Sequence, residues 1–292
     1  MAQHGRQSAG ALVLTIGVDF GNSRSGAAVH SSWDKKTSPP YASRYLGAKQ
    51  KVEKIPTRIS YYPDGRVKAW GALVDPQQDY YEYFKLLLEK DRQLHHGISR
   101  PDMLRRLRRL RKTPIDIVAD FLREMSQAIL GGRTMARRIG PDLIDIAQIR
   151  WVITVPAIWS ERAKHDTRQA AFQAGMGTDV DLVSEPAAAA IFMIESAGSI
   201  SPNPDKAFVV CDVGGGTIDT ITHSVDGAED LSLSEVVEGD GTMEGGAFVM
   251  ERFRSHTRGR LGGARFEQMA SHGRLWQLTS ADFEDVYFWR ES

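Results

Sequence analysis

One pattern constrains the fold of this 292-residue chain more than any other: an apolar strand, an Asp and a glycine-containing turn occur together twice. In the first copy the apolar run 12–18 leads into Asp19, and in the second the run 208–211 leads into Asp212. A β-rich segment follows each turn, so both copies are typical of β-hairpins. The repeat predicts two similar hairpins that face each other across a cleft between two halves of the fold.

The turns of these hairpins have the composition of an anion site. A tight turn with glycine can direct several backbone N–H groups into one concavity, and the missing Cβ lets an anionic oxygen approach closely. The second turn has three consecutive glycines, and Ser23, Ser25 and Thr217 offer hydroxyl donors. Each turn alone could be an ordinary hairpin with glycine at a positive φ, but two copies in similar contexts favour phosphate binding.

The Asp that ends each first strand predicts a cation beside the phosphate. A carboxylate at this position repels phosphate unless a positive charge lies between the two groups. Mg²⁺ prefers oxygen ligands and keeps several of its own waters. We therefore expect Asp19 and Asp212 to be outer ligands of Mg²⁺, acting through water.

Strand and helix patterns alternate along the rest of the chain, which indicates the α/β class. The clearest helix is expected over 114–130, where Thr113 can cap the N-terminus and Pro114 occupies the first turn. The segment 198–206, rich in turn-forming residues, is the best internal boundary. Further helices are expected over 80–92, 102–112, 160–174 and 186–197 and from Gly246 to about 261, and strands over 26–31, 58–63, 66–71, 149–155, 181–184, 207–213 and 218–225.

Composition indicates a globular protein without a bias toward a charged partner. Apolar residues make up 41% of the chain and charged residues 25%, and 37 basic residues balance 37 acidic ones. No nucleic acid and no membrane is therefore expected as a partner. The basic run 105–112 could bind nucleic acid or anionic lipid, but the zero net charge favours a solvated helix face above buried leucines.

Cysteine usage and the lack of targeting patterns favour the cytoplasm. Cys211 is the single cysteine, so no intramolecular disulfide can form, and we expect it to be a small core residue on a strand. No apolar run is long enough to span a bilayer, and the first residues lack a signal-peptide pattern. Residues 1–10 are polar and small and are expected to be disordered.

Six segments carry a family resemblance. They are IGVDFGNSRSGAAV at 16–29, KIPTRISYYPDGRVKAWG at 54–71, WVITVPAIWSERAKHDTRQAAFQAGM at 151–176, LVSEPAAAAIF at 182–192, VVCDVGGGTIDTIT at 209–222 and EGGAFVMERFRSHTRGRL at 244–261. They resemble segments of the nucleotide-binding domain of the heat-shock seventy-kilodalton chaperones, over roughly 12–261 of this chain. The resemblance is best with divergent members that lack the usual peptide-binding domain. It implies an actin-like ATPase (ribonuclease H-like) fold of two lobes, each a mixed sheet with flanking helices, with lobe I over 11–200 and part of lobe II over 201–292.

The resemblance also implies roles for individual residues. Glu185 and Asp219 match carboxylates near the metal and the attacking water, and Lys85 is the candidate for a catalytic lysine. From the residues alone, Glu185 could instead start the helix at Pro186, and Lys85 could be a solvated helix lysine. The positions expected to contact the phosphates are Gly21, Asn22 and Ser23 in the first turn, and Gly214, Gly215, Gly216 and Thr217 in the second.

The implied function is binding of ATP or ADP with Mg²⁺ and slow hydrolysis of ATP to ADP and phosphate. Asn22 and Ser23 replace paired threonines of the family, and its later segments, including the second Gly-Gly adenosine motif, are not visible in the 292 residues. Hydrolysis is therefore expected only if the remainder of lobe II is supplied. A truncated non-catalytic remnant or scaffold and a small-molecule kinase of the same superfamily are the alternatives. Besides the nucleotide, an unidentified protein partner or co-chaperone is left open.

Overall fold

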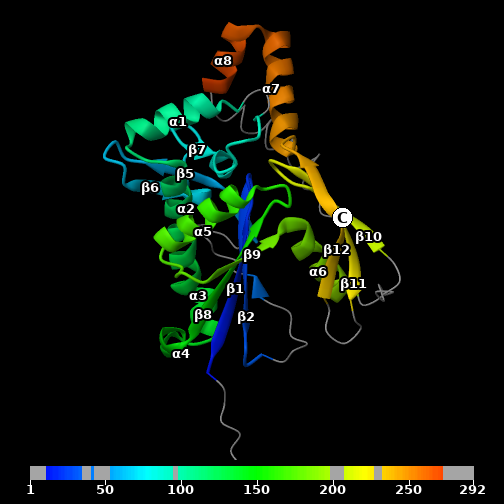
Figure 1. Ribbon diagram of the computed structural model, residues 1–292. Coiled ribbons are helices and arrows are strands. Elements are labelled where there is room, and N and C mark those ends of the chain that lie inside the picture. The colour runs from blue at the N-terminus through cyan, green and yellow to red at the C-terminus, as the bar shows by residue number, and fades with distance from the viewer. Residues whose placement is uncertain are drawn as a thin grey trace, which may run out of the picture.

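The computed structural model describes residues 11–34, 41–42, 53–94, 98–197, 207–226 and 232–271. Its strands form three sheets, and helices pack against the largest of them (Figure 1). That sheet has the order β3-β2-β1-β8-β9, with β4 also paired to β2. Its strands are β1 (Val13–Phe20), β2 (Arg24–Ser31), β3 (Tyr41–Ala42), β4 (Lys54–Pro56), β8 (Gln148–Val155) and β9 (Val180–Ser184).

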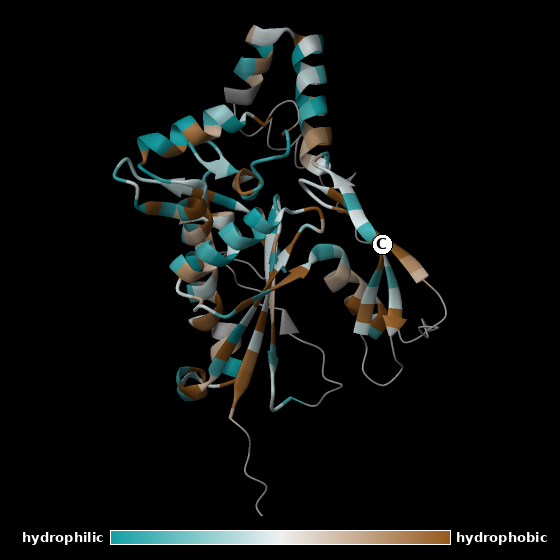
Figure 2. Cartoon of the chain, in the orientation of Figure 1, coloured by the Kyte–Doolittle hydropathy of each residue, from teal (hydrophilic) through white to brown (hydrophobic). Residues whose placement is uncertain are grey.

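The alternating pattern of β1 explains its place in the middle of the sheet. Leu14, Ile16, Val18 and Phe20 are fully buried, because successive side chains of a strand point to opposite faces. β1 pairs antiparallel with β2 and parallel with β8, and β8 pairs parallel with β9, so the sheet is mixed. Figure 2 shows apolar residues concentrated along β1. The predicted first hairpin and the predicted strands β8 and β9 are confirmed.

The helices on this sheet begin at the predicted caps. α2 (Pro114–Leu130) starts with a capping box, in which the Thr113 hydroxyl accepts from the Asp116 N–H and the Asp116 carboxylate accepts from the Thr113 N–H. α5 (Glu161–Gln173) is capped by Ser160 and packs against α2. Both predicted helices are confirmed. Between them in the chain lie two short helices, α3 (Arg133–Arg138) and α4 (Pro141–Ile146).

The second sheet has the order β6-β5-β7. The helix predicted over 80–92, in the segment that follows β6, is wrong. Within the described range 53–94, no α-helix forms over 80–92, and the helical element there is a short 3-10 helix. Tyr83 has a left-handed backbone with φ of 58°, which interrupts a right-handed helix, and the residues that follow are all buried instead of forming one stripe. The elements here are β5 (Arg58–Tyr61), β6 (Val67–Trp70), η1 (Gly71–Leu73), β7 (Tyr81–Glu82) and the 3-10 helix η2 (Phe84–Leu87).

Most of the basic run lies on α1 (Arg100–Arg109), which confirms the helix predicted over 102–112, although the helix ends before Arg111 and Lys112. Met103 and Leu107 of α1 are buried. The exposed arginines of the same helix are Arg105, Arg108 and Arg109. This distribution is that of a solvated face above buried apolar side chains.

The third sheet is antiparallel, with the order β10-β11-β12. Its predicted β10–β11 hairpin is confirmed. Cys211, expected in the core, is exposed instead, because alternate residues of β10 lie on an outward face that also carries Val209 and Val213. The elements are α6 (Glu185–Ala197), which packs on β10 and β11, then β10 (Ala207–Val213), β11 (Ile218–Asp226), β12 (Ser232–Thr242), α7 (Gly246–Leu261) and α8 (Gly263–Ser271).

A mixed sheet with flanking helices is the α/β architecture expected of an actin-like ATPase fold. The predicted linker 198–206 and the predicted disorder at 1–10 lie outside the described residues, and the division into two lobes stays a prediction. None of the helices in the described ranges is long and apolar enough to cross a membrane.

Candidate functional site

The two glycine-containing turns lie directly against each other. A Cβ built on Gly215 would come within 2.7 Å of Cβ of Ser23, and one built on Gly216 would come within 2.5 Å of Cγ of Asn22. Side chains at these glycines would therefore force the turns apart. The structure thus brings the two sequence motifs, 193 positions apart in the chain as measured from Asp19 to Asp212, into one place.

The first turn is held by a hydroxyl network from the neighbouring strand segment. The Thr57 hydroxyl donates to the carbonyl oxygen of Gly21 at 2.9 Å. The Ser25 hydroxyl lies 2.7 Å from the Thr57 hydroxyl. The Thr57 N–H donates to the carbonyl oxygen of Ser23 at 2.8 Å. Thr57 was not among the predicted site residues, although it lies in the segment just before the second predicted hairpin.

The second turn is held by the start of α7. The N–H groups of Gly245, Gly246 and Ala247 donate to the carbonyl oxygens of the three loop glycines, at 3.2, 2.9 and 2.7 Å. The Gly214 N–H closes the turn on the Thr217 carbonyl at 2.9 Å. These backbone hydrogen bonds help to position the loop, which suits a segment whose glycines have no side chains.

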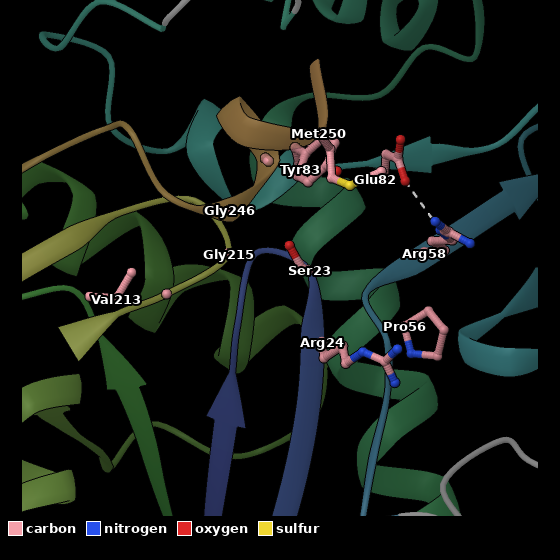
Figure 3. Close-up of a pocket in the computed structure, with 12 residues that line it drawn as sticks. Ser23, Arg24, Pro56, Arg58, Glu82, Tyr83, Val213, Gly215, Gly246 and Met250 are labelled. Carbon is pink, nitrogen blue, oxygen red and sulfur yellow. Dashed lines mark hydrogen bonds and ion pairs between the residues drawn. The ribbon is translucent and has the colours of Figure 1, made fainter. Parts of the chain in front are cut away.

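A pocket of about 170 Å³ opens where the turns meet. Figure 3 shows Ser23 and Gly215 at this meeting point, with Tyr83 and Met250 on one side and the Arg58–Glu82 ion pair on another. This pocket volume is below the roughly 300–1,000 Å³ that is common for ligand pockets. The other lining residues are Arg24, Pro56, Val213, Gly214, Gly246 and Ala247.

Four carboxylates near the turns influence one another: Asp19, Glu185, Asp212 and Asp219. Asp212 and Asp219 are opposite each other in the β10–β11 register, so their side chains share one face of that hairpin. Burial, followed by the charges of Asp219 and Asp19, raises the pKa of Asp212. Burial also raises the pKa of Glu185, with smaller contributions from Asp19 and Asp212 that Lys85 opposes. Asp212 therefore lies close enough to Asp19 and Asp219, and Glu185 close enough to Asp19 and Asp212, for their charges to interact, and we refer to these four carboxylates as the carboxylate cluster.

Lys85 is fully buried beside this cluster, so it is not a solvated helix lysine. Its Nζ donates to Oε1 of Glu185 at 2.5 Å and also to the carbonyl oxygen of Phe20. The ammonium lies 5.3 Å from the ring centroid of Phe20 and 5.2 Å from that of Trp159. A buried charge requires such partners, because leaving it unpaired costs several kcal/mol.

Buried oxygen atoms without partners provide a test of whether a hydrated cation fits. Asp219 is 1% exposed; its Oδ1 accepts from the Ile158 N–H at 3.2 Å, while its Oδ2 has no hydrogen-bond partner among the described residues. Oδ1 of Asn22 is likewise without one. Oxygens of this kind suit donation from the waters of a hydrated ion. Within the described ranges no three His, Cys, Asp or Glu side chains are arranged to hold a metal ion directly.

A second lysine reaches the cluster, and sequence reasoning did not single it out. Nζ of Lys54 lies 2.6 Å from Oδ2 of Asp19, and the Thr154 hydroxyl donates to Oδ1 of Asp19 at 3.3 Å. The charge of Lys54 also lowers the pKa of Asp212, against the larger effects that raise it. Only strand pairing reveals this lysine, because it comes from β4, 35 positions after Asp19.

Comparison with known proteins gives a consistent result. The family model described as Hsp70 protein matches residues 123–233. The chain is 27% identical over 227 residues to a chaperone protein HscA homolog of Polynucleobacter asymbioticus, covering 70% of this chain and 31% of the relative. It is 28% identical over 199 residues to human heat shock 70 kDa protein 12A, covering 62% and 28%. The chain thus spans about 30% of the length of these relatives.

The mixed sheet with its flanking helices is consistent with the actin-like ATPase fold. The Hsp70 family match over 123–233 and the similarity to these relatives support an Hsp70-like nucleotide-binding domain in this chain.

Proposed function

We propose that this chain binds ATP and ADP with Mg²⁺ and hydrolyses ATP slowly. The observation that carries the proposal is the placement of Asp19, Glu185, Asp212 and Asp219, with the buried Lys85, near two glycine turns in contact. The cleft would lie between lobe I, over 11–200, and the part of lobe II within 201–292. Phosphoryl transfer requires mainly positioning and charge neutralisation, which such a set of groups can supply.

The phosphates would be bound by backbone N–H groups and hydroxyls of the two turns. The first turn contributes Gly21, Asn22 and Ser23, and the second contributes Gly214, Gly215, Gly216 and Thr217. A positively polarised backbone concavity suits anionic oxygens, and the hydroxyls of Ser23 and Thr217 add donors.

Asp19 and Asp212 would hold Mg²⁺ through its waters, and the ion, when bound, neutralises phosphate charge. Lys85 fixes Oε1 of Glu185, which leaves the other carboxylate oxygen to accept a proton from the attacking water. The raised pKa of Glu185 makes it a better proton acceptor than an ordinary carboxylate. Asp219, held by the Ile158 N–H, would orient that water.

A non-catalytic nucleotide-binding scaffold is the second candidate, favoured by Asn22 and Ser23, which replace the paired threonines of the family in the first turn. Calorimetric titration with ADP and ATP in Mg²⁺ tests binding, and phosphate release tests hydrolysis. Binding with turnover supports the first proposal, binding without turnover supports the scaffold, and the absence of any binding contradicts both.

The relatives are named as a chaperone and a heat-shock protein, so we propose a chaperone-like role in the cytoplasm. A co-chaperone that senses the bound nucleotide would be the expected kind of protein partner. Affinity capture from cytosol with the ADP-loaded and nucleotide-free protein tests this, because such a partner should depend on the nucleotide.

A further inference from the structure

Lys54 reaches the carboxylate cluster through the register of three neighbouring strands. Asp19 on β1 is opposite Gly26 on β2, and Gly26 is opposite Lys54 on β4. Gly26 has no side chain, so the Lys54 stem can pass over it: a Cβ on Gly26 would lie 3.2 Å from Cγ of Lys54. The Lys54 side chain therefore crosses β2, and its Nζ lies 2.6 Å from Oδ2 of Asp19.

The exposure of this ion pair suits a role in ligand binding better than a role in folding stability. The Lys54 and Asp19 side chains are 48% and 39% exposed, and ion pairs this open contribute about 0–1 kcal/mol. The lysine is therefore able to leave Asp19 when a stronger anion arrives. The other lysine of the site, Lys85, is buried and bonded to Glu185 and is not mobile in this way.

The site carries an excess of negative charge, which Lys54 partly offsets. The cluster holds four carboxylates, Asp19, Glu185, Asp212 and Asp219, against the two ammonium groups of Lys54 and Lys85. Phosphate entering a site with this excess of negative charge is repelled unless a cation screens it. Lys54 supplies one such cation at an oxygen of Asp19 where hydrated Mg²⁺ would otherwise bind.

We propose that Lys54 is a built-in cation that partly replaces Mg²⁺ at Asp19, so that the domain retains nucleotide when divalent metal is removed. The inference rests on the proposed nucleotide binding. It assigns Lys54 two effects: attraction of the nucleotide phosphates by its ammonium, and competition with the hydrated metal for Asp19.

The test compares ADP affinity with Mg²⁺ and with EDTA, by calorimetry on the full chain. ADP is used because it binds without being hydrolysed. Lys54→Met keeps the apolar stem over Gly26 and removes the charge. We expect chelation to weaken ADP binding by at least about tenfold more in this variant than in the wild type, as loss of one nearby charge implies. Lys164→Met, which removes an equal charge from the ion pair with Glu161 on α5, should behave as the wild type does.

A second readout needs no nucleotide. With Asp19 freed, Mg²⁺ alone should raise the melting temperature of Lys54→Met more than that of the wild type. Lys54→Gln serves for both measurements if the methionine variant does not fold.

The outcomes separate the possibilities. An equal loss of ADP affinity on chelation in Lys54→Met and the wild type overturns the inference, even though nucleotide binding stands. A purely structural Lys54 would weaken ADP binding by the same factor in both buffers, which also overturns it. Absence of ADP binding by the wild type in either buffer overturns the proposed function, and the inference with it.

Discussion

Nζ of Lys85 lies 2.5 Å from Oε1 of Glu185, although the two residues are 100 positions apart in the chain. Lys85 comes from η2 and Glu185 from the first position of α6, so this contact joins two segments that meet only in the folded protein. The lysine side chain is completely buried and that of Glu185 is 14% exposed. The pair therefore has consequences for stability as well as for the site.

Replacing Lys85 by Met should lower the free energy of unfolding by about 3 kcal/mol, because Glu185 is left buried without its partner. The double variant Lys85→Met/Glu185→Leu should recover much of this loss, since both charges are then absent. Urea unfolding of the wild type, Lys85→Met, Glu185→Leu and the double variant measures the coupling energy between the two side chains. If the changes in unfolding free energy from the two single substitutions simply add in the double variant, Lys85 and Glu185 do not stabilise each other.

Asp212→Asn should reduce Mg²⁺-dependent ATP turnover by at least about a hundredfold while the protein stays folded. The amide loses the charge that would attract the hydrated metal, and the burial that raises the pKa of Asp212 makes a neutral side chain acceptable there. Asp181→Asn is the matched control, because Asp181 is a strand carboxylate paired with Arg150 on the surface. Phosphate release is measured for each. Turnover that survives Asp212→Asn would rule out the proposed mechanism.

Gly215→Ala should push the two turns apart and destabilise the protein by about 1–3 kcal/mol, since the added methyl group overlaps the Ser23 side chain. Weaker ADP binding should accompany the loss. Gly259→Ala, on α7, is the control: its Cβ would meet nothing within 4 Å, and helix propensity favours alanine by up to about 1 kcal/mol. Thermal melts and calorimetry compare the two. A Gly215→Ala variant as stable as the wild type would show that the turns need not touch.

Alkaline pH should destabilise the wild type through Tyr61. Burial, and then the charge of Asp120, raises the pKa of Tyr61 far above its ordinary value of 10, and its hydroxyl donates to Asp120 at 3.0 Å. Above the ordinary value the folded state therefore binds more protons than the unfolded state, so stability falls as the pH rises. Below it, Tyr61 contributes no pH dependence.

Urea unfolding between about pH 9 and 11 should show a steeper loss for the wild type than for Tyr61→Phe, which cannot titrate there. Identical slopes in the two proteins would show that the hydroxyl of Tyr61 ionises as freely in the folded state as in the unfolded state.

Much of the local structure was predictable because its causes are local. The capping residues Thr113 and Ser160, the alternating apolar residues of β1 and the glycine turns depend on neighbours a few positions away. Two predictions were wrong because they depended on contacts with residues distant in the chain. The segment 80–92 packs all of η2 inward around Lys85 instead of forming an amphipathic helix, and Cys211 lies on the outward face of β10.

The sequence by itself determined the two phosphate-type turns, the Asp at the end of each first strand and the α/β order of elements, because turn chemistry and side-chain period act over short distances. Only the tertiary structure decided that Glu185 meets Lys85 and that Asp19 meets Lys54. The first contact depends on how η2 and α6 pack, and the second on strand register across Gly26. A shift of one residue in that register would turn Lys54 to the other face of the sheet, and nothing within β4 alone specifies it.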